Sequence, residues 1–253
     1  MANRIDVNVV KSNDLILNSR FNLTVQQQKI LLFLIAQIRF TDTEFKWCEF
    51  QIVEFCRACD ISRKGNNYNL LRQSIKDISD KSVWVKLPDG RETLLRWIEK
   101  PYIDKKNGTI RIRLDEDMKP YLLQLRDKFT QYNLISALSF KSKYSLHCYE
   151  FLKCLLRSAD STQTFQSVDY VAQQLHSPYA EFRDFRSRVL DKAVSEINEV
   201  SDIFVEYELK RSGRRITHIL FTVRQKHYSD YSDLAHLKKM ANIISFNQFK
   251  RGF

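Results

Sequence analysis

Four polar side chains follow Pro178 within a segment whose apolar spacing predicts a helix: Arg183, Arg186, Ser187 and Arg188. An arginine guanidinium can donate two hydrogen bonds to O6 and N7 of guanine, or it can bind phosphate oxygens. This chemistry favours contact with nucleic acid. A plainer interpretation stays open, in which Arg183 and Asp184 are solvated charges and Arg188 pairs with Asp184 or Asp191 at helical spacing.

A helical wheel at about 100° per residue separates this segment into two sides. The apolar arc, which we expect to face the core, contains Phe185, Val189, Leu190, Ala193, Val194 and Ile197. Ser187 and Arg188 lie clear of it, and Arg183 lies at its edge. Arg186 falls among the apolar residues by angle, but its place near the start of the helix lets it project beyond the core.

A second predicted helix carries another polar face, made of Asn69, Arg72, Gln73 and Lys76. Asparagine and glutamine amides can pair with adenine edges, and the two cations suit phosphates. We expect Leu70, Leu71, Ile75 and Ile78 to face inward. An ordinary solvated helix face explains the same polar residues equally well.

Two predicted hairpin tips are basic. They contain Lys105 and Lys106 in the first case, and Lys210, Arg211, Arg214 and Arg215 in the second. Cations at such tips fit contact with the DNA backbone or the minor groove. Exposed turns are often basic for solubility alone, so these residues are secondary candidates.

The elements that must position these residues follow one order between Phe165 and Lys226. FQSVDYVAQQL predicts a short helix, a break follows at residues 176–178, and AEFRDFRSRVLDKAVSEIN predicts a longer helix. IFVEYEL and ITHILFTV then alternate as the strands of a hairpin. Helix, turn, longer helix and hairpin are the layout of a winged helix.

The same order occurs earlier in the chain. Two helices are predicted from FQIVEFCRACDIS and YNLLRQSIKDIS. A hairpin about the Pro88–Gly90 turn is predicted from VWVKL and TLLRWIE, and a further strand from TIRIRL. Phe50 matches Phe165 at an offset of 115, and Val83 matches Ile203 at an offset of 120. This drift is what loop insertions between two copies would produce. The sequence therefore predicts an α+β protein with two tandem winged-helix domains related by internal duplication.

The predicted domains are residues 1–133, residues 134–228 and a tail, 229–253, that could form a helix. NVVKSNDLILNSRFNLT predicts a short helix and a connection, and Thr24 with Gln27 forms a capping box for a core helix. DEDMKPYLLQLRDKF predicts a helix from Asp115, TQYNLISALSF an extended link, and SKYSLHCYEFLKCLL the first helix of the second copy.

Composition agrees with a polyanion partner and gives little support to catalysis. The 253 residues carry 41 Lys and Arg against 30 Asp and Glu, a net charge of +11. We expect no catalytic residues, no metal and no cofactor, because phosphate-binding loops and histidine pairs are missing. Cys56 and Cys59 form a lone C-x-x-C with only Cys48 near, which favours reduced thiols in a cytoplasmic protein. No signal peptide or membrane span is expected.

Three stretches resemble the iteron-binding plasmid replication initiator (Rep) proteins over roughly residues 8–226. They are KSNDLILNSRFNLTVQQQKILLFLI, KSKYSLHCYEFL and FRSRVLDKAVSEINEVSDIFVEYELKRSGRRITHILFTV. The resemblance implies two winged-helix domains, of which the second reads bases and the first combines DNA contact with dimerisation. Carried over, this favours Arg183, Arg186, Ser187 and Arg188 as readers over the polar face of residues 69–76.

The resemblance also implies partners and a role. Monomers would bind direct repeats of double-stranded DNA at a plasmid origin, help open the duplex, and recruit host replication proteins such as the initiator and the helicase. Homodimers would bind an inverted repeat at their own promoter. Two alternatives stay open: a transcriptional repressor of the same fold, and a nicking endonuclease of rolling-circle replication, against which the missing histidine pair counts.

Overall fold

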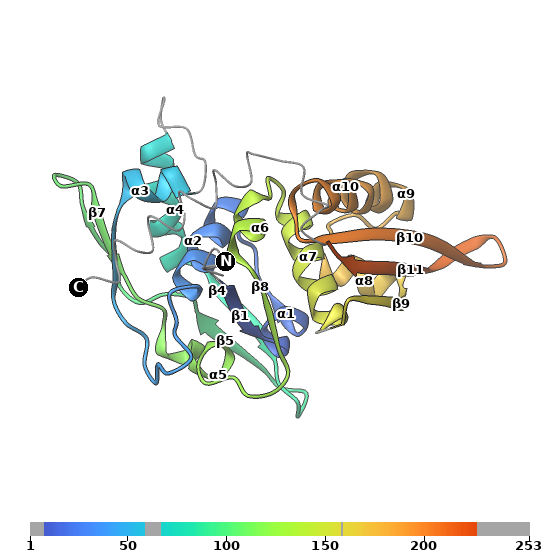
Figure 1. The fold of residues 1–253 in the computed structure, drawn as a ribbon, viewed down its shortest axis with the longest axis horizontal. Helices are drawn as coiled ribbons and strands as arrows, with labels where there is room; N and C mark the ends of the chain where they lie inside the picture. The colour runs from blue at the N-terminus through green and yellow to red at the C-terminus, as the bar shows by residue number, and fades with distance from the viewer. Residues whose placement is uncertain (1–7, 59–66, 158, 227–253) are drawn as a thin grey trace, which may run out of the picture. The chain divides into compact units, whose positions relative to one another are not determined.

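The computed structural model describes residues 8–58, 67–157 and 159–226, and the chain divides into two compact units (Figure 1). The first unit runs to Leu138 and the second begins at Ser139. The possible helix in the tail 229–253 and the second cysteine of the C-x-x-C motif lie outside the described residues. The domain limits at 133 and 228 stay predictions.

The first unit contains these helices: α1 (Asn13–Leu17), α2 (Val25–Ile35), α3 (Ile52–Ala58), α4 (Asn67–Ser79), a 3-10 turn (Glu116–Met118), α5 (Lys119–Leu122) and α6 (Leu134–Ser139). Its strands are β1 (Asn8–Ser12), β2 (Ser19–Arg20), β3 (Cys48–Gln51), β4 (Ser82–Lys86), β5 (Glu92–Arg96), β6 (Tyr102–Asp104), β7 (Thr109–Ile112) and β8 (Phe129–Asn133). They form the sheets β3-β7-β6, β2-β4-β5 and β1-β8.

Helix α2 is the central helix of the first unit. The predicted capping box is confirmed: Thr24 Oγ1 accepts from the Gln27 backbone N–H at 3.2 Å, and Gln27 Oε1 accepts from the Thr24 backbone N–H at 3.0 Å. Residues 30–35 are all buried, and the Phe33 ring packs edge-on against Phe50 and Phe55. A helix that is apolar all round belongs inside a core, so α2 anchors α3 and α4 around it.

The second unit has a shorter list of elements. Its helices are α7 (Lys143–Leu156), α8 (Val168–Gln174), α9 (Phe182–Phe185), the π turn η2 (Arg186–Leu190) and α10 (Asp191–Val200). Its strands are β9 (Ser161–Ser167), β10 (Ile203–Ser212) and β11 (Arg215–Gln225) in the order β10-β11-β9. Inward residues of the sheet, among them Val205, Ile219 and Phe221, are buried.

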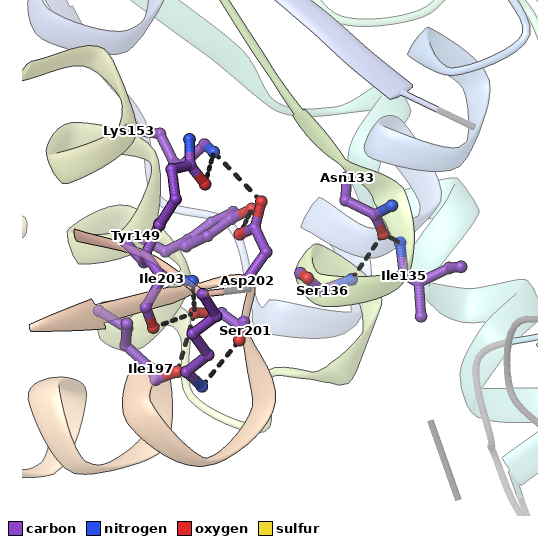
Figure 2. Close-up of polar contacts among 11 residues, drawn as sticks. Asn133, Ile135, Ser136, Tyr149, Lys153, Ile197, Ser201, Asp202 and Ile203 are labelled. Carbon is purple, nitrogen blue, oxygen red and sulfur yellow. Dashed lines mark hydrogen bonds and ion pairs between the residues drawn. The ribbon is translucent and has the colours of Figure 1, made fainter. Parts of the chain in front are cut away.

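A buried polar cluster joins α7 to the connection between α10 and β10. Tyr149 Oη donates to Asp202 Oδ1 at 2.7 Å, and Lys153 Nζ lies 3.1 Å from Asp202 Oδ2 (Figure 2). Beside them, the buried Ser201 hydroxyl donates to the Ile197 carbonyl at 2.8 Å. These contacts satisfy polar groups that would otherwise be buried without partners, and they fix the end of α10 where the hairpin begins.

Several predicted elements are wrong in detail. The segment from Asn8 begins as strand β1, because it pairs with β8 about 120 residues away, which no local pattern shows. The predicted extended link 130–140 is strand only to Asn133, whose side chain accepts from the backbone N–H groups of Ile135 (2.8 Å) and Ser136 (3.3 Å) and starts α6 (Figure 2). The helix predicted from Asp115 is only a 3-10 turn followed by one turn of α5.

Candidate nucleic-acid interface

The predicted helix that carries Arg183, Arg186, Ser187 and Arg188, called the reader segment below, is not a continuous α-helix. Helix α9 runs into a π turn at Arg186–Leu190, closed by the hydrogen bond from the Asp191 N–H to the Arg186 carbonyl, before α10 begins. Buried residues recur every four positions, at 185, 189, 193 and 197. In an α-helix this spacing drifts by about 40° at each step. The wider π turn takes up part of the drift and keeps these side chains against the core.

The π turn also explains the position of Arg186. A regular wheel places this residue among the apolar side chains, whereas in the structure Arg186, Arg183, Ser187 and Arg188 are all exposed. All four side chains are therefore accessible to a ligand, although the buried Phe185 lies between Arg183 and the other three.

Arg186 is held by two residues from other elements. Its Nε donates to the Tyr207 hydroxyl at 3.2 Å and lies 3.5 Å from Asp191 Oδ2. The Tyr207 hydroxyl in turn donates to Asp191 Oδ1. Burial raises the pKa of Tyr207, and the hydrogen bond to Asp191 raises it further. The tyrosine thus remains a donor at neutral pH.

Arg188 has a simpler environment. Its Nε lies 3.4 Å from Asp184 Oδ1, one helical turn back, and its guanidinium carbon lies 5.6 Å from the centre of the Tyr179 ring. This is one of the two pairings that the plainer interpretation offered for Arg188. Both side chains are about half exposed or more, at 61% and 48%, so the pair is weak and can open.

The end of α10 is tied to strand β10 by an asparagine. Asn198 Nδ2 donates to the Val205 carbonyl at 2.8 Å, and Asn198 Oδ1 accepts from the Val205 N–H at 2.7 Å. Lys226 Nζ donates to the carbonyls of Asn198 (2.6 Å) and Ser201 (2.9 Å) where α10 ends. A cation at this end also complements the helix dipole. The reader segment and the β10–β11 hairpin are thus fixed to each other within the unit.

The β10–β11 hairpin forms a long basic wing. Strand β9 pairs with β11 only between Arg224 and His218, so the hairpin continues beyond the sheet as a two-stranded ribbon (Figure 1). Gly213 has φ +60°, a left-handed conformation that glycine adopts without strain, and it turns the ribbon between Ser212 and Arg215. Arg211, Arg214 and Arg215 are exposed at this tip, and Lys210 is ion-paired with Glu208 at 2.7 Å.

The polar face of α4 in the first unit is formed as predicted, with one exception. Leu71, Ile75 and Ile78 are fully buried, whereas Leu70 is 49% exposed beside the polar face, so its predicted inward position is wrong. A side chain one position before Leu71 is turned by about 100° and no longer meets α2.

Side-chain contacts already occupy part of this face. Arg72 donates to Asn69 Oδ1 at 2.5 Å, and Gln73 Nε2 donates to Asp77 Oδ1 at 2.7 Å. Lys76 is exposed. The four residues share one face, but Asn69, Arg72 and Gln73 would have to exchange partners to meet DNA.

The first wing tip lies between β6 and β7. Lys105 and Lys106 are exposed there. The Asp104 carboxylate accepts from the backbone N–H groups of Lys106 (2.8 Å) and Asn107 (3.1 Å) and from Asn107 Nδ2 (2.7 Å). The Asn107 hydrogen bonds lower the pKa of Asp104. This turn presents both lysines outward. The strand predicted from TIRIRL pairs with β6 and β3 and not with the β4–β5 hairpin.

The described part of the chain contains no cluster of three or more metal-ligating side chains. Within the same residues, no helix has the length and apolar character needed to span a bilayer. The candidate surfaces described above consist of cationic and amide side chains at helix faces and hairpin tips.

Comparison with known proteins decides the family. The model described as "Initiator Replication protein, WH1" matches residues 8–153, and "Initiator Rep protein, WH2" matches residues 171–223. The chain belongs to the replication initiator family. The WH2 match contains the reader segment and the β10–β11 wing. The predicted α+β fold with two winged-helix domains is thereby confirmed.

Individual proteins resemble this chain over most of its length. The chain is 25% identical over 228 residues to a "Replication initiation protein" of Escherichia coli, covering 85% of this chain and 69% of that one. It resembles the Pi initiator protein, solved in complex with iteron DNA, with a TM-score of 0.75 and 18% identity over 88% of this chain and 98% of that one. Domains 2 and 3 of RctB align with a TM-score of 0.49 at 12% identity, over 82% of this chain and 85% of that one.

Sequence reasoning missed the contacts that hold Arg186 of the initiator. Asp191 follows Arg186 by five positions, which is a neighbour across a π turn but not along an α-helix. Tyr207 comes from strand β10, and no local spacing connects it to Arg186. The four-residue recurrence of buried side chains was the one signal that could have indicated the π turn.

Proposed function

We propose that this protein initiates plasmid replication by binding direct repeats of double-stranded DNA at the origin, without catalysing a reaction itself. The observation that carries the proposal is the segment 183–188, which exposes three arginines and is fixed to a basic wing. Family membership supports the role in replication initiation. The Pi initiator protein, whose fold this chain shares, was solved bound to iteron DNA.

Each unit offers the parts of a winged-helix contact. The reader segment of the second unit would enter a major groove, where guanidinium groups distinguish guanine from other bases. The face of α4 would contact a second groove more weakly, since Asn69, Arg72 and Gln73 already have partners. The tips at residues 105–106 and 210–215 would contact backbone phosphates or the minor groove.

The roles of the units and the partners follow from the family resemblance. The second domain would be the main DNA reader, and the first would add DNA contact and dimerisation. Monomers would bind the origin repeats, and homodimers an inverted repeat at the promoter. Host replication proteins, such as the initiator and the helicase, would be recruited after the duplex opens. The protein would act in the bacterial cytoplasm, where its plasmid replicates.

A transformation assay tests the proposal. The gene and its flanking DNA are joined to a selectable marker without another origin, and permanganate reactivity of unpaired thymines near the repeats reports duplex opening. We expect replication and opening that depend on both the gene and the repeats. A protein that binds its promoter yet gives neither result would instead be a dedicated repressor. Nicking of supercoiled DNA in magnesium or manganese would contradict the non-enzymatic part.

A further inference from the structure

Arg186 differs from the other exposed arginines of the reader segment in how it is held. Its Nε contacts both Tyr207 and Asp191, and these two side chains contact each other, so the three groups close a triangle. The triangle joins the π turn, the start of α10 and strand β10. Arg188, by contrast, has its ion pair on its own helix and rests beside the Tyr179 ring.

The geometry uses only one edge of the guanidinium. A guanidinium has five N–H donors, and both contacts engage the single donor at Nε. The two terminal amino groups, which carry the other four donors, are not used in these contacts. A guanine needs two of these donors, one for O6 and one for N7.

Tyr207 is well suited to hold this edge. Its ring packs near Phe221 on the same sheet, with ring centres 6.3 Å apart, so the hydroxyl is presented from a rigid strand. The same strand continues to Lys210 and Arg211 at the wing. The hydroxyl accepts from Arg186 and donates to Asp191, which fixes both neighbours.

We infer that Tyr207 and Asp191 are positioning residues that hold Arg186 by its Nε edge, so that its terminal amino groups are ready for a guanine in the bound duplex. The inference rests on the proposed function and adds to it a device that orders one base reader before DNA arrives. Ordering a long side chain in advance removes an entropy cost that binding would otherwise meet. It also links the base reader to the strand that carries the wing.

Three variants test the inference: Tyr207→Phe, Asp191→Asn and, as a matched control on the other pair, Asp184→Asn. Binding is measured by fluorescence anisotropy on two duplexes, one enriched from a random library by the wild-type protein and one with the same bases shuffled. Tyr207→Phe should weaken binding to the enriched duplex by about 2- to 10-fold, the range expected for one unfixed side chain, and leave the shuffled duplex unchanged.

Asp191→Asn separates positioning from simple charge. Removing a negative charge near DNA should by itself tighten binding to both duplexes. If Asp191 positions Arg186, the affinity of Asp191→Asn for the enriched duplex should instead fall, while its affinity for the shuffled duplex should rise slightly. Asp184→Asn, which changes the same charge beside Arg188, should tighten binding to both.

Two further measurements make the outcome decisive. In an Arg186→Ala background, Tyr207→Phe should have no added effect, because the group that it positions is gone. In the free protein, the Nε–H resonance of Arg186 should exchange slowly with water and speed up in Tyr207→Phe, which reports the contact without DNA.

The possible failures are distinguishable. If the wild-type protein does not discriminate between the two duplexes, the proposed function fails and the inference falls with it. If it discriminates but both variants bind like the wild type, or if Tyr207→Phe still weakens binding in the Arg186→Ala background, the inference alone is overturned. An Asp191→Asn variant that binds both duplexes more tightly also overturns it.

Discussion

Replacing Arg186 with alanine should separate base recognition from general attraction to DNA. A bidentate contact between an arginine and a guanine contributes about 1–3 kcal/mol of discrimination, so the affinity for a specific duplex should fall by about 5- to 150-fold. The fold should tolerate the change. In the free protein Arg186 is 48% exposed, and an exposed ion pair such as that with Asp191 contributes about 1 kcal/mol or less.

Arg215 at the tip of the β10–β11 wing provides the matched control. It is exposed on the same unit and is a candidate phosphate contact. A cation that neutralises one phosphate changes the slope of log affinity against log salt by about 0.9. Arg215→Ala should therefore weaken binding to specific and shuffled duplexes equally and reduce the slope by about 0.9, whereas Arg186→Ala should leave the slope nearly unchanged.

Anisotropy titrations of both variants on both duplexes, at four or more salt concentrations, measure affinity and slope together. Thermal unfolding of each variant serves as the check on folding. If Arg186→Ala weakens binding to both duplexes equally and lowers the salt slope of the affinity as Arg215→Ala does, Arg186 is a phosphate contact. Its assignment as a base reader is then refuted.

Three further predictions concern the framework that holds the site. Asp202→Ala should lower the free energy of unfolding in urea by about 3 kcal/mol, because it leaves the buried Lys153 ammonium without its carboxylate. Asp184→Ala, which removes only an exposed ion pair, should change it by about 0.5 kcal/mol. Equal effects of the two variants would contradict this reasoning. Burial raises the pKa of the Cys148 thiol to about 12, so it should resist alkylation at pH 8 until the protein unfolds, and rapid labelling of the folded protein would be the contrary result. Hydrogen bonds from Asn107 lower the pKa of Asp104. The Asp104 carboxylate should therefore stabilise the first wing turn fully above the ordinary carboxyl pKa of about 3.9, and this stabilisation should be lost as the pH falls through the lower pKa of the folded protein. An NMR titration of Asp104 with a midpoint at or above about 3.9 would contradict this.

Local signals in the sequence were sufficient for the main helices and the hairpins. The capping box at Thr24 and Gln27 defines the start of α2, and alternation of apolar residues defines β10 and β11. These features depend on neighbours within a few residues, which a sequence displays directly. The duplicated order of elements then indicated the winged-helix fold.

Features that depend on distant partners could not be predicted in this way. Strand β1 exists because it pairs with β8, and its own residues NVVKS carry no decisive pattern. The helix after Asn133 was missed for a different, local reason: LISALS also fits an extended apolar run, and the Asn133 cap on the next few residues decides between the two.

The candidate site shows the same division. Helical spacing indicated that Ser187 and Arg188 face outward, and it indicated the Arg188–Asp184 pair as one alternative. The wheel angle alone placed Arg186 among the apolar residues, but the expectation that it projects beyond the core is confirmed, at a point where the chain makes a π turn. The contact with Tyr207 depends on tertiary packing between a helix and a strand, which spacing along one element cannot show.

A nuclease footprint on the DNA that flanks this protein's own gene, taken at two salt concentrations, tests the central claim most directly. The account predicts protection of several evenly spaced direct repeats whose centres lie about two helical turns apart. This sequence-specific protection should persist at the higher salt concentration, while non-specific binding is lost. Protection of a single inverted repeat at the promoter would contradict the role at an origin. The absence of specific protection at either salt would contradict sequence-specific DNA binding altogether.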